Sequence, residues 1–208
     1  MLHVESIKKI YAGYSNVYDV IFKQFFYPRQ RHVIRTMNIM PGDKVLDVGV
    51  GTGLSLPLYP SSCNVVGIDL SAEMLKKAKE KISKYRFEHI DLMEMDASNL
   101  RFDDNSFDHV IATFVISVVP DPVKVIAEMK RVCKKTGKIV IVNHFQSSNK
   151  IVAKIEEFIN PLCCKIGWRS DLSLDELVTN ADLEINHKYK LKKFDLWKVV
   201  FAVNNKPC

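Results

Sequence analysis

The sequence predicts an α/β protein with a doubly wound, mostly parallel sheet of seven strands. Short apolar segments with the length of buried strands alternate along the chain with segments of helical periodicity. The first of these strands, 45–48, runs directly into a loop with three glycines, as the first half of a nucleotide-binding βα unit does. The last two strands, expected at 183–192 and 195–203, resemble an antiparallel hairpin at the sheet edge. A chain of 208 residues suffices for one domain with a full core, so we expect a single domain over 1–208.

Three helices are expected before the first strand. Residues 2–11 place apolar side chains near helical spacing, a second stretch follows Ser15 and stops near Pro28, and a third runs from about 29 to 39. The second stretch is rich in apolar and aromatic side chains, namely Val17, Tyr18, Val20, Ile21, Phe22, Phe25 and Phe26. Basic residues nearby fit an interfacial membrane helix, whereas the same pattern fits a helix packed on a sheet, and both interpretations stay open.

The remaining elements follow the alternation of strand and helix. A helix that begins at 54–58 is cut short by Pro57 and Pro60, and the helix after 122 is expected to end at basic residues with Gly137 as its C-cap. Strands are expected at 64–68, near 86–90, within 106–119 and at 138–142, and helices at 72–84, 122–134, 149–160 and 173–180.

Charge is concentrated at the two ends of the chain. Residues 1–36 hold six basic and two acidic side chains, giving 6 − 2 = +4, and residues 184–208 give the same balance, so the middle sums to 6 − 4 − 4 = −2. A basic surface suits anionic lipid or nucleic acid, and from charge alone an ordinary solvated surface is favoured. No apolar run is long enough to cross a membrane, and we expect neither a secretory signal nor a nucleic-acid partner.

Five cysteines without a C-x-x-C pair are expected to be reduced thiols in a cytoplasmic protein, with no metal site.

Several polar residues are expected at the carboxyl ends of the strands, where ligands of such sheets bind. Asp47 is an acid inside an apolar run and should have a bound partner, because burying an unpaired carboxylate is costly. Asp69 closes the second strand, where it can accept both ribose hydroxyls of a nucleoside, and Asp96 can accept an adenine amino group. Leu54 replaces the last glycine of a dinucleotide fingerprint, which argues against a dehydrogenase. For the glycine loop itself, the alternative is a tight turn needed only for packing.

The pattern D-x-G-x-G-x-G at 47–53 resembles motif I of the class I S-adenosylmethionine-dependent methyltransferases, which have a Rossmann-like fold. The segments VGVGTGLSLPLYP, VISVVPDP, VNHF and GWR narrow the resemblance to the soluble bacterial phosphatidylethanolamine N-methyltransferases. Val50 departs from the broader class, many members of which carry Cys there. The resemblance implies stepwise methylation of phosphatidylethanolamine toward phosphatidylcholine by a cytoplasmic enzyme peripherally associated with the inner face of the membrane. The alternatives are a methyltransferase of a quinone precursor or of another small amine, and a non-catalytic lipid-binding protein.

The resemblance also assigns site residues. Those expected to bind S-adenosylmethionine are Tyr18, Asp47, Gly49, Gly51, Gly53, Asp69, Leu70, Met74, Asp96, Ala97 and Thr113. Those expected to bind the substrate are Ser117, Asn143, Phe145, Trp168, Arg169 and Arg31.

The substrate amine, with a pKa near 10.4, is neutral in only about one molecule in a thousand at pH 7, so the enzyme must remove a proton. His144 is the first candidate acceptor because imidazole titrates near neutrality, and the alternative is a histidine that fixes the loop by hydrogen bonds. Tyr18 and Tyr14 are the other candidate catalytic residues. Residues 1–40, which carry both, are expected to form a lid and a membrane-contact segment. The sequence leaves the oligomeric state open.

Overall fold

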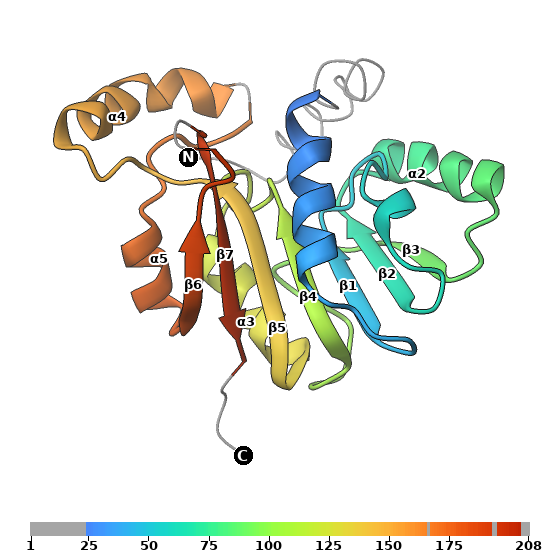
Figure 1. Ribbon diagram of the computed structural model, residues 1–208. Coiled ribbons are helices and arrows are strands. Elements are labelled where there is room, and N and C mark those ends of the chain that lie inside the picture. The colour runs from blue at the N-terminus through green and yellow to red at the C-terminus, as the bar shows by residue number, and fades with distance from the viewer. Residues whose placement is uncertain (1–23, 166, 193–194, 205–208) are drawn as a thin grey trace.

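The structure is a computed structural model that describes residues 24–165, 167–192 and 195–204. Its centre is a seven-stranded sheet with the order β3-β2-β1-β4-β5-β7-β6 (Figure 1). The strands are β1 Lys44–Val48, β2 Asn64–Asp69, β3 Ile90–Glu94, β4 Phe107–Thr113, β5 Cys133–His144, β6 Ile185–Tyr189 and β7 Trp197–Val203. The pairs from β3 to β5 are parallel, and β7 runs antiparallel to both β5 and β6. The predicted doubly wound sheet with its C-terminal hairpin is confirmed.

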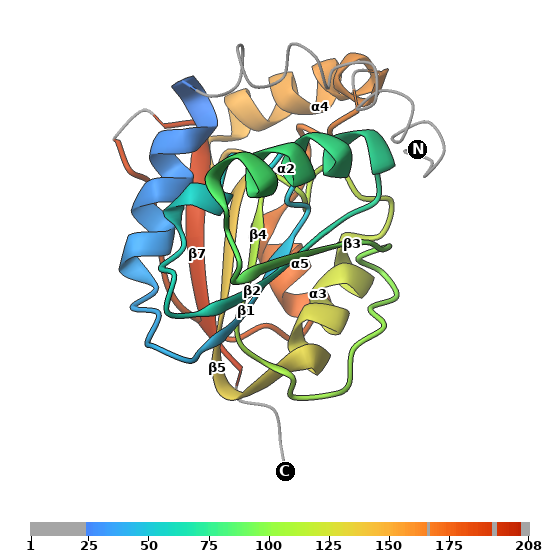
Figure 2. The same cartoon turned by 90° about the vertical axis from the view of Figure 1, so that its right-hand side faces the viewer.

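Helices cover both faces of the sheet (Figures 1 and 2). The helix over residues 24–36 and α2 pack on one face, and α3 and α5 pack on the other. The helical elements with printed bounds are η1 Leu56–Leu58, α2 Ala72–Tyr85, α3 Pro122–Val132, α4 Lys150–Lys165 and α5 Leu174–Asn180. Strand order reverses between β1 and β4, so the carboxyl ends of these strands form the crevice where such sheets bind ligands. Within the described ranges, no helix combines the length and the apolar composition that crossing a bilayer requires.

The break expected at Pro28 is wrong, because the helix over residues 24–36 continues through it. A proline inside a helix costs about 3 kcal/mol. Tertiary packing offsets this cost: Val33 and Met37 are fully buried, and Phe26 stacks on Phe114 with ring centroids 4.0 Å apart. Of the other expected N-terminal elements, the helix over 2–11 and most of the second stretch lie outside the described residues.

The third strand begins at Ile90 rather than near residue 86. Arg86 adopts a left-handed conformation with φ 54° and caps α2 by donating its backbone N–H to the carbonyl of Ile82. The chain must then turn before it can pair with β2, which delays the strand.

The role expected for Gly137 is also wrong. Helix α3 ends at Val132, and Gly137 lies inside β5, in a bulge where the pairing with β4 jumps from Phe107↔Cys133 to His109↔Lys138. A Cβ atom at Gly137 would lie 2.6 Å from Cys133 Sγ, 2.8 Å from the Lys134 carbonyl oxygen and 2.9 Å from the Asp108 carbonyl oxygen. The glycine is therefore required for close backbone approach rather than for ending a helix.

We expect Gly137→Ala to lower the free energy of unfolding by about 1–3 kcal/mol, because two of the three crowding atoms are backbone oxygens that cannot turn away. Urea unfolding followed by circular dichroism measures the change. Equal stability of variant and wild type would mean that the bulge relaxes around the added methyl group.

Candidate active site

An open cleft lies at the carboxyl ends of β1, β2 and β4, with about 850 Å³ of empty space including its solvent-filled mouth. Its lining consists of Gly49, Gly51, Ile68, Asp69, Leu70, Ser71, Met74, Met95, Asp96, Ala97, Thr113, Phe114, Val115, Val118, Val119 and Pro120. One wall is apolar and carries the loop after β4, and the floor is the glycine loop after β1.

The three glycines after β1 all have positive φ, but they serve different ends. A Cβ atom at Gly49 would lie 2.1 Å from Val115 Cγ2, and one at Gly53 would lie 2.6 Å from Leu56 Cδ1. At Gly51 a Cβ atom would meet no atom within 4 Å. Gly49 and Gly53 are thus needed for packing, whereas Gly51 leaves its backbone open to a ligand in the cleft.

Asp69 closes β2 and joins the glycine loop to α2. Its Oδ2 accepts a hydrogen bond from the Gly51 N–H at 2.9 Å, and its Oδ1 accepts one from the Ser71 N–H at 2.9 Å. Burial raises the pKa of this carboxyl above its usual value, and the backbone donors oppose that shift. The backbone N–H of Leu70 is a third donor to this carboxylate. A carboxylate has about four acceptor positions, so one remains for a hydroxyl donor such as that of a ribose.

Asp47 lies behind the cleft and outside its lining, with 1% of its surface exposed. Its Oδ2 accepts hydrogen bonds from Ser55 Oγ at 2.7 Å and from Tyr59 Oη at 2.9 Å. Among the described residues, nothing hydrogen-bonds its Oδ1. Burial raises the pKa of Asp47 to about 6 against the two hydrogen bonds, and the charge of Asp69 adds to the increase. The expected partner of this acid is therefore supplied in part by Ser55 and Tyr59, which sequence reasoning did not identify.

The cleft brings together most of the residues expected to bind the cofactor. Gly53 and Asp47 are not part of the lining, and Tyr14 and Tyr18 lie outside the described residues. The expected residues in the lining are Gly49, Gly51, Asp69, Leu70, Met74, Asp96, Ala97 and Thr113. The sequence did not predict that the apolar residues between Phe114 and Pro120 form a wall of the cleft. An apolar run after a strand is equally compatible with core residues and with residues that line a cleft.

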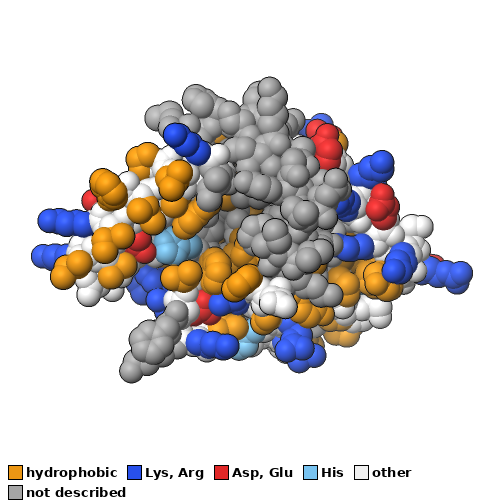
Figure 3. Space-filling view, turned by 90° about the horizontal axis from the view of Figure 1, so that it is seen from above, with side chains coloured by type: hydrophobic (Ala, Val, Ile, Leu, Met, Phe, Trp, Pro, Cys, Tyr) orange, Lys and Arg blue, Asp and Glu red, His pale blue; other side chains and the backbone are white. Residues whose placement is uncertain are grey.

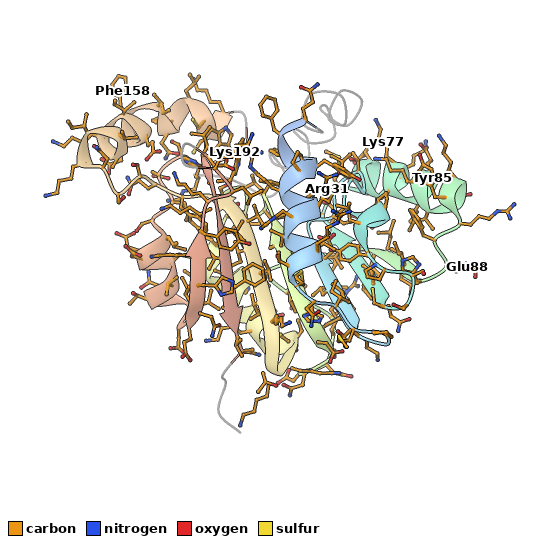
Figure 4. All side chains as sticks on the ribbon, in the orientation of Figure 1. Arg31, Lys77, Tyr85, Glu88, Phe158 and Lys192 are labelled. Carbon is orange, nitrogen blue, oxygen red and sulfur yellow. The ribbon has the colours of Figure 1, made fainter. Side chains whose placement is uncertain are left out.

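None of the residues expected to bind the substrate is in the described lining of the cleft, and three of them, Ser117, Asn143 and Arg169, form a hydrogen-bond network beside it. Asn143 is fully buried, and its Oδ1 accepts from the Ser117 N–H at 3.3 Å while its Nδ2 donates to the His144 carbonyl at 2.7 Å. The Arg169 N–H donates to the Ser117 carbonyl at 2.8 Å, and the Arg169 guanidinium pairs with Asp171 at 3.0 Å. Two further residues, Phe145 and Arg31, are respectively buried in the core and exposed on the helix over residues 24–36 (Figure 4).

His144 stands at the end of β5, outside the cleft lining. Its Nδ1–H donates to the Leu196 carbonyl at 3.1 Å, which leaves Nε2 to carry the lone pair when the ring is neutral. Nε2 is 3.4 Å from Glu156 Oε1 on α4, and the Trp168 ring contacts the imidazole edge-on with centroids 5.4 Å apart. The histidine thus links β5, the segment that leads into β7, and α4.

The helix over residues 24–36 contacts the wall of the cleft. Phe26 stacks on Phe114, and Gln30 Nε2 donates to Thr113 Oγ1 at 3.1 Å in a buried hydrogen bond. Arg29 pairs with the buried Asp195 at 2.6 Å. The helix over residues 24–36 is therefore anchored beside the ligand cleft.

Comparison with known proteins defines the class of protein. Residues 46–141 match a family described as "Methyltransferase domain". A solved S-adenosylmethionine-dependent methyltransferase of Aquifex aeolicus shares the fold, with a TM-score of 0.69 over 98% of this chain and 99% of that one at 21% identity. The chain belongs to the class I S-adenosylmethionine-dependent methyltransferases, and S-adenosylmethionine is the cofactor of this family.

Curated relatives narrow the comparison. The chain is 39% identical over 185 residues to a phosphatidylethanolamine N-methyltransferase of Cereibacter sphaeroides, covering 88% of this chain and 90% of that protein. It is also 32% identical over 179 residues to a demethylmenaquinone methyltransferase of Bacillus cytotoxicus, covering 80% and 75% of the two chains. The resemblance to the bacterial phosphatidylethanolamine N-methyltransferases is confirmed, and a similarity to quinone methyltransferases stands beside it.

We expect Gly51→Arg to abolish measurable S-adenosylmethionine binding, because the new side chain would project from an open backbone position into the cleft. Gly42→Arg is the matched control: Gly42 also has positive φ and open space around a Cβ, but it lies before β1 at the other end of the strand. Isothermal titration calorimetry on both folded variants measures the effect. Equal affinity of Gly51→Arg and Gly42→Arg would refute cofactor binding at this loop.

We expect Asp47→Asn to change how stability depends on pH. The folded-state pKa of Asp47 is about 6 against about 4 when unfolded, so between these values the folded state holds more protons and stability falls as pH rises. Relative to Asp47→Asn, the wild type should lose about 2 kcal/mol of unfolding free energy between pH 4 and 7. Urea unfolding across this range without added cofactor measures the difference, and parallel pH profiles would contradict it.

Proposed function

We propose that this protein methylates the head-group amine of phosphatidylethanolamine, stepwise toward phosphatidylcholine, at the inner face of the membrane from the cytoplasm. The observation that carries the proposal is the 39% identity to a phosphatidylethanolamine N-methyltransferase over almost the whole length of both chains. The helix over residues 24–36 packs beside the cleft, which supports a role of residues 1–40 as a lid and membrane contact.

The residues of the cleft suit the cofactor. S-adenosylmethionine supplies a methyl group on a sulfonium sulfur, and the protein has to bind and orient it. Asp69 would accept a ribose hydroxyl with its remaining acceptor position. Asp96 lines the cleft and already accepts from the Ser98 N–H at 2.8 Å, which leaves an oxygen for the adenine amino group. Leu70, Met74 and the apolar wall would exclude water from the adenine.

The substrate amine has to lose a proton before it can attack the methyl group. We propose His144 for this step, because its Nδ1–H is fixed by a carbonyl and its Nε2 carries no hydrogen bond from the described residues. Tyr14 and Tyr18 remain proposed partners of the amine. The methylated head group stays cationic, and an aromatic face stabilises such a cation by about 0.5–2 kcal/mol, which favours Trp168 beside His144.

A second candidate function is methylation of a quinone precursor. The 32% identity to a demethylmenaquinone methyltransferase favours it, with lower coverage of both chains. Transfer of radiolabelled methyl groups to phosphatidylethanolamine, demethylmenaquinone, phosphoethanolamine and ethanolamine separates the candidates. Label in the phospholipid supports our proposal, and label only in the quinone product or in a soluble amine would replace it.

We expect His144→Ala to lower the turnover number at least tenfold with little change in S-adenosylmethionine affinity, because a positioned proton acceptor contributes about 10²–10⁴-fold. Glu156→Gln is the matched control: it keeps the size of the side chain that faces Nε2 but removes its charge. If His144 accepts the proton, its loss should also abolish the acidic limb of the pH profile. If both variants lose turnover equally with unchanged profiles, His144 only positions α4.

A further inference from the structure

Helix α4 presents an apolar face to solvent. It lies beyond the carboxyl ends of the strands, on the same side of the molecule as the cleft (Figure 1). Phe158 is 86% exposed, Ile151 74% and Leu162 65%. With Ile155 these residues follow the spacing i, i+4, i+7 and i+11, so they form one stripe, and Val152 and Ile159 widen it. Figure 3 shows hydrophobic side chains gathered over this helix.

The side of α4 that faces the protein is polar. Glu156 Oε2 accepts from the Ser147 N–H at 2.7 Å, and Asn160 Oδ1 accepts from the Ser170 N–H at 3.0 Å. Cys163 is the buried apolar residue of this helix. An ordinary surface helix buries its apolar stripe and exposes its polar one. In α4 this arrangement is inverted. Its apolar stripe is exposed to solvent, which indicates that this face binds another molecule or surface.

The charges of α4 specify the kind of occupant. Its two acids are engaged toward the body, since Glu156 also faces His144 and Glu157 Oε1 accepts from Gln146 Nε2 at 2.9 Å. Its lysines, Lys150, Lys154 and Lys165, are exposed beside the apolar stripe. The outer side of the helix is therefore apolar along one stripe and basic along its border, as an interfacial helix on an anionic lipid surface requires.

We infer that α4 lies in the head-group region of an anionic lipid bilayer and holds the mouth of the cleft against it. A second copy of this chain fits less well, because a symmetric contact would bring the same lysines together. Through Glu156 and His144, α4 connects directly to the end of β5, so docking of the helix orients the strand ends relative to the bilayer. The inference rests on the proposed function in one respect, that the substrate is a lipid.

Vesicle flotation with the full chain tests this surface. Vesicles of phosphatidylcholine with phosphatidylglycerol should bind the wild type, and binding should fall with salt and without phosphatidylglycerol. Phe158→Ser should lower the partition coefficient about tenfold and Ile155→Ser/Phe158→Ser about a hundredfold. The control Met40→Ser/Tyr85→Ser removes two side chains that are each 54% exposed elsewhere, and Figure 4 shows Tyr85 on α2, away from α4. It should bind like the wild type.

Three outcomes would overturn the inference. They are equal binding by the α4 variant and the control, no binding of the wild type, and a wild-type dimer that Phe158→Ser dissociates in sedimentation. A monomeric short-chain phosphatidylethanolamine separates the inference from the proposed function. The α4 variant should methylate it at the wild-type rate while losing activity on vesicles. If the wild type methylates neither form, the proposed function fails, and the flotation result still decides the role of α4.

Discussion

The cleft depends on the hydrogen bonds that the Asp69 carboxylate accepts from the backbone. By accepting from the Gly51 and Ser71 N–H groups, the carboxylate joins the loop after β1 to the start of α2 at the point where the strand order reverses. Buried backbone donors need acceptors, and this one side chain satisfies a donor in each of the two loops. Its burial also keeps the acceptor in a poorly solvated setting, where each further hydrogen bond from a ligand is stronger than in water.

Sequence patterns were sufficient for the sheet, the glycine loop and most of the cleft. These features depend on local rules: a short apolar run predicts a buried strand, and parallel strands bring their carboxyl ends to one edge. Sequence patterns were insufficient where the structure depends on a contact between residues far apart in the sequence. The packing of Phe26 on Phe114 carries the helix through Pro28, and the carbonyl of Asp108 requires Gly137, although neither contact leaves a local signal. The same holds for Tyr59, which serves Asp47 from the far side of the glycine loop.

Helix α4 illustrates a different limit of periodicity. Its apolar spacing correctly predicts a helix, but spacing alone does not reveal which side faces the protein. The direction is set by Glu156 and Asn160, whose hydrogen bonds to the loops at 147 and 170 fix the polar side inward. His144 contacts both α4, through Glu156, and the segment that leads into β7, through the Leu196 carbonyl. The residue proposed as proton acceptor therefore also touches the helix proposed to contact the lipid surface.

The arrangement of the outermost strands bears on how the protein stays dispersed. An uncovered strand offers unpaired backbone groups to any neighbouring chain, and charged side chains there discourage such pairing. β3 carries Asp91 and Glu94 at one margin of the sheet, and β6 carries Lys188 at the other. Each edge strand therefore repels the same edge strand of another copy. The edges formed by β3 and β6 still carry charges of opposite sign. If the protein gathers on a membrane surface as proposed, these charges oppose the like-to-like strand addition that leads to aggregates.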